Sequence, residues 1–365
     1  MASAGVLWLI AAGGLSLAAF AGSAQKTAPI PSDPLEMVTG QIRSVNAGAR
    51  RTAAVRLLDR ARNGYALRSV GRGYHLKVSF TVDSGGQTEY DGAWQMEEVF
   101  DPKQGYWWTA QTADAYAITR ISSNGMFFGE ETGSYVPLRL QEARAALFDP
   151  IPSSQNVAHG SIRTSTATFK GAELTCILSG SQKPASAAPG RRWDETEDCV
   201  DPQSGLLRTH SQVPGRYYAY DYSDAPQLAG HLLPRTVTVT EAGRVVTKIS
   251  VDSLTELPAA EPSLFVPTEE MKARGPAIVM AGAQKIWRVL GEYPSASGAT
   301  AYTVCVFGVV TPSGELVEAH SLQPSDPYTQ AAVEAAKTMS FSNAARAAHP
   351  QQHFVFVIEQ FVPSQ

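Results

Sequence analysis

Hydrophobic and polar residues alternate with a period of two over most of the chain, which predicts β-strands. In residues 74–82, Leu76, Val78, Phe80 and Val82 alternate with polar neighbours, and the turn sequence DSGG follows directly. Similar runs recur at hairpin spacing as far as residue 254, with turn residues between them. The pattern therefore predicts a meander of many antiparallel strands.

Two segments inside this region follow a helical period instead. An apolar stripe in residues 55–61 stops at Asn63-Gly64, a pair that commonly ends helices. Residues 137–148 form a second helical segment between two strands. We expect these helices to cover the sheet of a large β-rich domain, which we place at residues 25–270.

The C-terminal part of the chain has a different order of elements. A stretch rich in proline and charge begins at residue 255, and we place the interdomain linker at residues 271–282. After a short helix or turn come two strands joined by the turn TPSG, then a helix that opens at Asp326, an N-cap, with Pro327 at its first position. The chain ends in the strand HFVFVIEQF. This order predicts a small ββαβ domain at residues 283–365 and an α+β fold class for the whole chain.

The N-terminus carries features of an export signal. The first 24 residues contain no charged residue, and they include the apolar run Val6–Phe20. Gly22-Ser23-Ala24 supply the small residues that signal peptidase requires, so we interpret residues 1–24 as a signal peptide. No Lys or Arg precedes the apolar run, so an uncleaved inner-membrane anchor is the alternative. We expect a periplasmic or secreted protein, associated with a membrane only if this segment is retained.

The three cysteines fit an exported protein. Cys176 and Cys199 lie in two strand-like runs separated by a loop, so pairing of these runs as a hairpin would bring the sulfurs together. Given export, we predict a disulfide between them, worth about 3 kcal/mol from loop entropy. Two unrelated buried thiols are the alternative. Cys305, within an apolar run, is expected to be a buried small hydrophobic residue.

Composition and motifs disfavour several classes of function. The net charge is −4 and the basic residues form no stripe, which argues against nucleic-acid binding. The chain lacks a CxxC, a Cys/His cluster, G-x-S-x-G, H-E-x-x-H and a P-loop. We therefore expect a protein that is not an enzyme, with no catalytic residue, metal or cofactor.

Residues 283–365 resemble the C-terminal domain of TonB-like proteins. The matching positions are Tyr293-Pro294, Pro312-Ser313-Gly314, Ala331-Ala332, Ala335-Ala336, Phe341 and the last strand, Phe354–Phe361. The resemblance implies that the domain binds an extended segment of an envelope protein or outer-membrane transporter by adding a strand to its sheet. The expected partner-binding edge strand comprises Phe354, Val355, Phe356, Val357 and Ile358. The alternative is that these side chains simply pack on the helix.

The β-rich domain is similar to the half-barrel of LolA-type lipoprotein carriers. Both have an N-terminal helix near a run of long antiparallel strands, which here ends in SLFVP. The resemblance implies a concave apolar face that holds acyl chains. The candidate lining residues are Phe80, Trp94, Phe100, Trp107, Trp108, Phe127 and Phe128. The alternative is that these aromatic side chains fill the core.

Together these patterns predict a non-catalytic cell-envelope protein that recognises a partner protein through its C-terminal sheet, in connection with transmembrane transport. A periplasmic carrier of a lipid or other apolar ligand is the alternative. An organised apolar cavity in the β-rich domain would favour the carrier, whereas a filled interior and an open C-terminal sheet edge would favour partner recognition.

Overall fold

The computed structural model describes residues 38–363 apart from 46, 114, 124, 152–156, 158–159, 181–189, 278–284, 296–301 and 342–350. The predicted signal peptide lies outside the described residues, as do residues 278–282 of the predicted linker. In the part of the chain that is described, no helix is long and apolar enough to cross a membrane.

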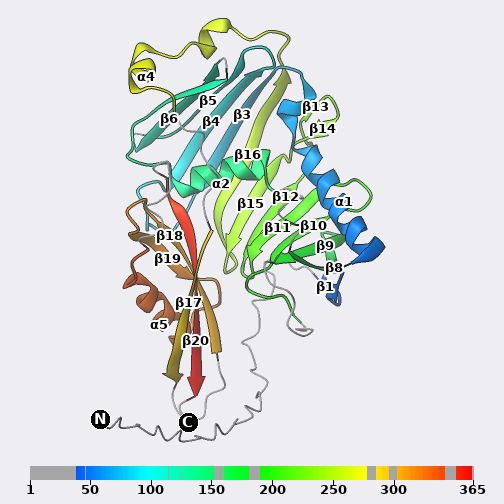
Figure 1. Cartoon of the computed structure of the whole chain (residues 1–365), viewed down its shortest axis with the longest axis vertical. Coiled ribbons are helices and arrows are strands. Elements are labelled where there is room, and N and C mark those ends of the chain that lie inside the picture. The colour runs from blue at the N-terminus through cyan, green and yellow to red at the C-terminus, as the bar shows by residue number, and fades with distance from the viewer. Residues whose placement is uncertain are drawn as a thin grey trace, which may run out of the picture.

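The largest sheet of the described chain is antiparallel and has 14 strands (Figure 1). Its strands are β1 (Val38–Thr39), β2 (Arg43–Ser44), β3 (Tyr74–Val82), β4 (Gly92–Asp101), β5 (Gly105–Thr112), β6 (Tyr116–Ser123), β7 (Met126–Glu131), β8 (Ser161–Phe169), β9 (Ala172–Gly180), β10 (Thr196–Val200), β11 (Leu207–Val213), β12 (Arg216–Asp221), β15 (Thr236–Glu241) and β16 (Arg244–Glu256). Two short strands, β13 (Gln227–Leu228) and β14 (His231–Leu232), form a separate two-stranded sheet.

The predicted antiparallel meander is confirmed, with one long-range pairing. Strands β3 to β7 follow one another as hairpins, and so do β8 to β12, β15 and β16. The two series are joined because β16 pairs with β3, placing Ile249 opposite Phe80. Segments that are distant in the sequence thus form the middle of the sheet.

Two helices cover one face of this sheet, α1 (Gly48–Gly64) and α2 (Leu138–Phe148), as Figure 1 shows. Alternation directs every second side chain of each strand toward them; in β3, Tyr74, Leu76, Val78, Phe80 and Val82 are all 3% exposed or less. These residues join buried side chains of α1 and α2 in one hydrophobic core. The 3-10 helix η1 (Leu67–Val70) connects α1 to β3.

The opposite face is covered near β4 to β7 by the segment that follows β16. This segment contains the 3-10 helix η2 (Pro262–Phe265) and the short helix α4 (Glu269–Arg274). Phe265 packs with Val99 and Trp107, and Met271 packs with Ile121 and Phe128. The Pro-rich stretch is therefore part of the packed structure as far as α4.

The C-terminal residues form a second sheet of four strands in the order β17-β20-β18-β19. They are β17 (Lys285–Ser295), β18 (Tyr302–Val310), β19 (Leu316–Ser321) and β20 (His353–Pro363), with helix α5 (Pro327–Lys337) between the last two in sequence. The expected short helix or turn near residue 285 is instead strand β17, which pairs in parallel with β20. The unit is thus βββαβ rather than ββαβ.

Helix α5 begins as the sequence predicted. The Asp326 side chain accepts a hydrogen bond from Thr329 N at 2.7 Å, and Thr329 Oγ1 accepts one from Asp326 N at 2.8 Å. This capping box, with Pro327 at the first position, satisfies two of the backbone N–H groups that a helix start leaves open. Ala332 and Ala336 then face the sheet and are fully buried.

The two sheets are packed against each other. A shared hydrophobic cluster brings Leu138 of α2 and Val213 of β11 together with Phe307 of β18 and Phe356 of β20. The face of β20 opposite α5 is therefore covered by the large sheet and α2, not by solvent.

Candidate functional site

The aromatic residues expected to line an apolar cavity do not gather around one. Phe80, Trp94 and Trp108 are 2%, 0% and 2% exposed and belong to the core between the sheet and its helices. The rings of Phe80 and Trp94 stack with their centroids 5.3 Å apart. Their position favours the alternative that these side chains fill the core.

The remaining candidates are divided between the two faces of the sheet. Trp107 precedes Trp108 in β5, so its side chain points to the opposite face, where Phe265 and Met271 cover it together with Phe128. Phe127 lies beside Tyr106, with ring centroids 6.0 Å apart, and Phe100 lies beside Tyr74 at 5.4 Å. Residues on opposite faces of one sheet cannot line a single cavity.

The strand expected to be a partner-binding edge is an inner strand of its sheet. Residues Phe354–Ile358 of β20 pair with Lys285–Val289 of β17 on one side and with Cys305–Val309 of β18 on the other. The edge assignment of Phe354, Val355, Phe356, Val357 and Ile358 is therefore wrong, because both sides of their backbone are already paired. The sequence analysis missed this because it did not identify β17 as a strand.

Strand β19 is an outer strand of the small sheet, and one of its outward-facing backbone N–H groups already has a hydrogen-bond partner. The outward-facing N–H of Ala319 donates to Gln87 Oε1 at 2.9 Å, and Gln87 lies in the loop between β3 and β4 of the large sheet. An added strand would have to displace this side chain. The other outer strand of this sheet is β17.

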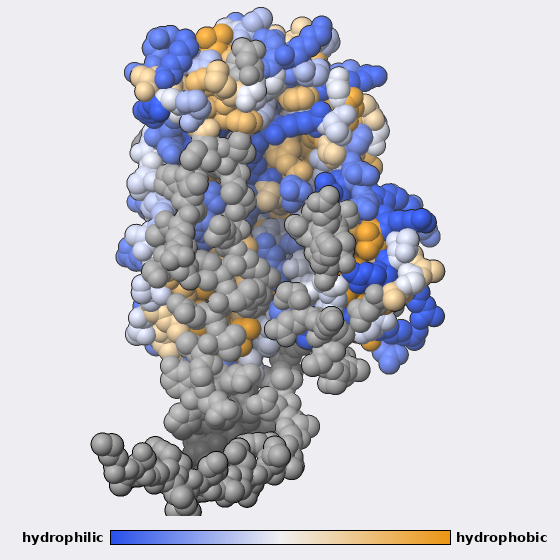
Figure 2. Space-filling model, in the orientation of Figure 1, coloured by the Kyte–Doolittle hydropathy of each residue, from blue (hydrophilic) through white to orange (hydrophobic). Residues whose placement is uncertain are grey.

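An open cleft of about 490 Å³ lies between α1 and strands β8 and β9. Thr164, Thr166 and Thr175 contribute hydroxyl and methyl groups from the strands. The described residues that line it are Gln41, Arg43, Val45, Arg50, Ala53, Ala54, Leu57, Thr164, Ser165, Thr166 and Thr175. Figure 2 shows charged and polar side chains on the outer side of α1, with apolar side chains beside it.

The N-terminal segment builds one side of this cleft by running along the edge of β8. Val38 and Thr39 pair with β8, and Gly40 N then donates to Thr166 O at 2.7 Å. A Cβ atom at Gly40 would lie 2.6 Å from Thr166 Oγ1, so only glycine permits this close approach. The chain pairs again at Arg43 and then enters α1.

Small side chains on α1 keep the cleft open. Arg50, Ala53, Ala54 and Leu57 follow the spacing i, i+3, i+4, i+7 and so share the side of the helix that faces β8. The helix is held near its start by Arg51, whose Nη2 donates to Val157 O and Gly160 O at 3.2 and 3.1 Å. Because α1 is held in place while two of its facing residues are alanines, space remains above the strands.

The charge of the cleft is positive. Arg43 and Arg50 stand at its rim, and none of the described residues that line it is Asp or Glu. Neither guanidinium is in an ion pair with a described residue. A cleft with charges of one sign and low-dielectric walls attracts ligands of the opposite sign.

The sequence analysis did not identify this cleft. The apolar stripe predicted at residues 55–61 contains two of the buried side chains of α1, Leu58 and Ala61, and the third is Ala54. A signal was present in the sequence, since Arg50, Ala53 and Leu57 follow the spacing i, i+3, i+7 and continue the predicted stripe toward the start of the helix. The distance between the helix and the sheet decides whether a stripe of side chains packs on the sheet or lines a cleft.

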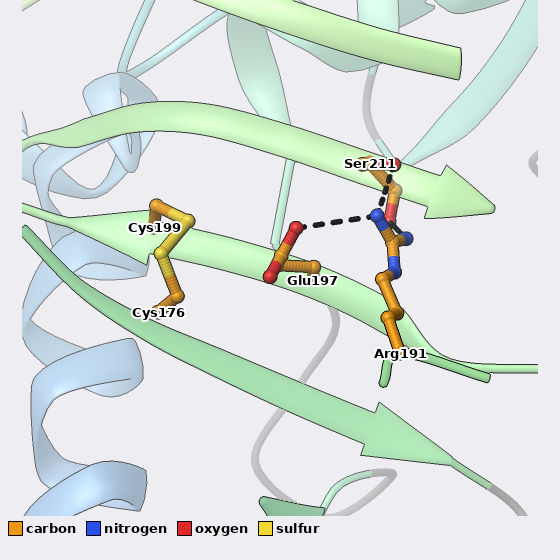
Figure 3. Close-up of a disulfide and its surroundings, with 5 residues drawn as sticks. All are labelled: Cys176, Arg191, Glu197, Cys199 and Ser211. Atoms are coloured by element: carbon orange, nitrogen blue, oxygen red, sulfur yellow. Dashed lines mark hydrogen bonds and ion pairs between the residues drawn. A yellow bond between two sulfur atoms is a disulfide. The ribbon is translucent and has the colours of Figure 1, made fainter. Parts of the chain in front are cut away.

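The predicted disulfide is confirmed. Cys176 of β9 and Cys199 of β10 are directly opposite each other and joined, as Figure 3 shows. Glu197 offers a carboxylate within 4.8 Å of both sulfur positions, a grouping that could hold a metal. However, the sulfurs are bonded to each other and Glu197 pairs with Arg191 at 3.2 Å, so these ligands are already occupied. The third cysteine, Cys305, is buried as expected.

No protein-family model matches the chain, and no curated protein matches it in sequence. The resemblance to TonB C-terminal domains therefore remains a prediction. Among solved structures, the chain is similar to a LolA superfamily protein from Nitrosomonas europaea, with 8% identity and a TM-score of 0.34 over 59% of this chain and 97% of that one. It is similar to a domain described as an outer membrane lipoprotein-sorting protein from Vibrio parahaemolyticus, with 10% identity and a TM-score of 0.35 over 58% and 97%. It is also similar to MucB, with 12% identity and a TM-score of 0.27 over 61% and 65%.

Proposed function

We propose that this protein is a non-catalytic carrier of the cell envelope that binds an anionic amphiphile in the cleft between α1 and strands β8 and β9. The observation that carries the proposal is that the described lining of one open cleft combines apolar side chains with two arginines and contains no acidic residue. The periplasmic location rests on the export signal predicted in residues 1–24.

The two kinds of lining group suit the two parts of an amphiphile. The guanidinium groups of Arg43 and Arg50 match the geometry of a carboxylate or phosphate head group. Val45, Ala54 and Leu57 offer apolar contacts to the first part of an acyl chain, where each buried methylene contributes about 0.8 kcal/mol.

The size of the cleft sets what it can hold. Ligand pockets usually measure about 300–1,000 Å³, and the volume here is about 490 Å³. This space accommodates a head group and part of one chain, with the remainder of the ligand outside.

Recognition of a partner by strand addition is the weaker proposal. Its expected strand, β20, is paired on both sides, and the β19 edge is capped at Ala319 by Gln87. An envelope protein that docks elsewhere, for example to deliver or receive the ligand, is compatible with the carrier function.

A fluorescent fatty acid and its uncharged methyl ester, titrated into the purified protein, test the proposal. We expect the acid to bind and the ester to bind more weakly. Arg50→Glu should weaken binding of the acid about tenfold or more, because it replaces a charge-assisted contact by repulsion. Arg56→Glu is the matched control, since Arg56 is exposed on α1 and is not a lining residue.

A second pair of variants tests the apolar wall. Ala53→Trp would fill the cleft and should abolish binding, whereas Thr52→Trp on the exposed side of α1 should not. Equal effects of the cleft and control variants, or equal affinity for acid and ester, would rule out this site for an anionic amphiphile.

A further inference from the structure

A second cavity lies beneath α2 and shares no lining residue with the cleft beside α1. It has a volume of about 170 Å³ and is bounded by α2 with the residues after it, by β11 and β12, and by Phe354 of β20. Ala145 and Asp149 are exposed and mark its mouth. Its floor is formed by His210 and Tyr220, which are 7% and 1% exposed.

His210 at the floor is paired with Asp198, a residue next to the cavity that does not itself line it. Asp198 is fully buried, and its Oδ1 lies 2.8 Å from His210 Nδ1. In a neutral imidazole held this way, Nδ1 donates to the carboxylate and Nε2 is left as an acceptor. The second carboxylate oxygen, Asp198 Oδ2, has no hydrogen-bond partner among the described residues.

Two further buried polar atoms at this cavity also lack partners within the described chain, Tyr220 Oη and Gln141 Oε1. The amide nitrogen of Gln141 donates to Val136 O and Gln352 O, both at 3.0 Å, so the orientation of the amide is set. Buried polar atoms in folded proteins nearly always have partners. Two such atoms line this cavity, and the third belongs to the carboxylate that pairs with His210, which favours a bound group that supplies hydrogen-bond donors.

The charges around the cavity indicate which kind of ligand it would bind. The nearby Arg216 is paired with Glu142 and Glu241, each at 2.7 Å, so its charge is already balanced. The partner of Asp198 in an ion-pair geometry is His210, which is charged only when protonated. Asp149 adds a second carboxylate at the mouth, near Arg62. A buried carboxylate without a cation is costly, and a positively charged ligand would offset that cost.

We propose that this cavity binds a small primary amine, whose ammonium group enters between α2 and β12. The ammonium donates hydrogen bonds to the unpartnered acceptors that line the cavity, Tyr220 Oη and Gln141 Oε1, and balances the charge of the nearby Asp198. The rings of Tyr218 and Tyr220, which line the cavity, favour a cation over a neutral group of the same size. This site is separate from the proposed carrier function and does not depend on it.

Calorimetric titration with putrescine and with 1,4-butanediol tests the inference, because the two molecules have the same chain and differ in their end groups. We expect putrescine to bind at least tenfold more tightly than the diol. Failure of putrescine to bind, as for a cavity that holds only water, or equal affinities for the two molecules, would overturn the proposal.

Substitutions at and beside the cavity test whether putrescine binds there. Asp198→Asn should weaken putrescine binding at least tenfold, and Tyr220→Phe, which keeps the ring, should weaken it about threefold to tenfold. Tyr217→Phe is the matched control on the opposite face of β12 and should have no effect. Unchanged putrescine affinity in Tyr220→Phe and in a folded Asp198→Asn would also overturn the proposal. Arg50→Glu should leave putrescine binding intact, so this test and that of the carrier function fail independently.

Discussion

Arg139 of α2 and Glu318 of β19 form an ion pair across the junction of the two sheets, with Nη2 and Oε2 2.8 Å apart and side chains 2% and 1% exposed. The Arg139 guanidinium also lies over the ring of Phe307 of β18, 5.2 Å from its centroid. Helix α2, which covers the large sheet, is thus joined to the small sheet by a buried ion pair. The C-terminal unit is not a module tethered by a linker alone.

This pair belongs to a network of charges. Arg139 also bonds Glu241 at 2.8 Å, and Arg216 bonds Glu241 and Glu142, each at 2.7 Å. His320 of β19 contacts Glu241 from the other side. Burial alone would raise the pKa of Glu241, but Arg139, His320 and Arg216 together hold it well below its usual value. Removing one member would leave a buried charge without its partner, so we expect the network to hold the two sheets in this orientation.

Removing one member of this network should be strongly destabilising. In Arg139→Ala, three glutamates keep their burial and lose a shared cation, so we expect a loss of about 3–5 kcal/mol in the free energy of unfolding. Urea denaturation at neutral pH measures it. Lys337→Ala, which breaks an exposed pair with Glu334 on α5, is the control and should cost less than about 1 kcal/mol. Similar losses in the two variants would contradict the structural role of the network.

Glu98 should make stability depend on pH. It is fully buried, accepts hydrogen bonds from Tyr74 and Arg68 at 2.6 and 2.8 Å, and pairs with Arg144 at 2.8 Å. Burial by itself would raise the pKa of Glu98, but Arg144 and Arg68 outweigh it, so the pKa lies below the usual value of 4.5. Because the folded-state pKa is depressed, this stabilisation is complete above pH 4.5 and is lost as the pH falls toward the folded-state pKa.

We therefore expect Glu98→Gln to lower the free energy of unfolding by about 2–4 kcal/mol at pH 7, and by less as the pH falls below 4.5. Denaturation at a series of pH values measures the difference. Glu97→Gln is a close control: its side chain is on the opposite face of β4, 35% exposed beside His75 and Lys77. A pH-independent difference between wild type and Glu98→Gln would refute the assignment.

The disulfide should contribute measurably to stability. Cys176 and Cys199 are 23 residues apart, so loop entropy predicts a loss of about 3 kcal/mol on reduction. Thermal denaturation with and without dithiothreitol measures it, and the double variant Cys176→Ala/Cys199→Ala supplies the control. The variant should melt at a lower temperature than the oxidised protein and should not respond to dithiothreitol. A reductant effect of equal size in both proteins would point to another cause.

The cap on β19 can be tested by hydrogen exchange. Gln87→Ala removes the acceptor of the Ala319 N–H, so we expect exchange at Ala319 to become about threefold to tenfold faster. Exchange at Phe307, on the adjacent strand β18, should change little because its strand is paired on both sides. Unaltered exchange at Ala319 would show that Gln87 does not close this edge.

Local patterns in the sequence were enough to predict individual elements. The alternation in β3, the capping residues Asp326 and Pro327, and the cysteines on neighbouring strands each act over a few residues or one hairpin. These three features depend only on local geometry, and the structure confirms each of the three predictions.

The pairing of distant segments was not predictable in the same way. Whether β20 is an edge depended on β17, about 70 residues earlier, and its residues carry no period that marks them as a parallel partner. For the same reason the buried charges at Arg139 and Glu318 are indistinguishable in sequence from solvent-exposed ones.

The amino-acid sequence by itself determined that this chain forms antiparallel strands, a capped C-terminal helix and a disulfide-linked hairpin, because backbone geometry and neighbouring side chains suffice for these. Only the tertiary structure decided which aromatic residues fill the core, which strand is central and where open space remains beside α1 and beneath α2. These features arise from the distances between elements far apart in the chain, and packing of the complete structure sets those distances.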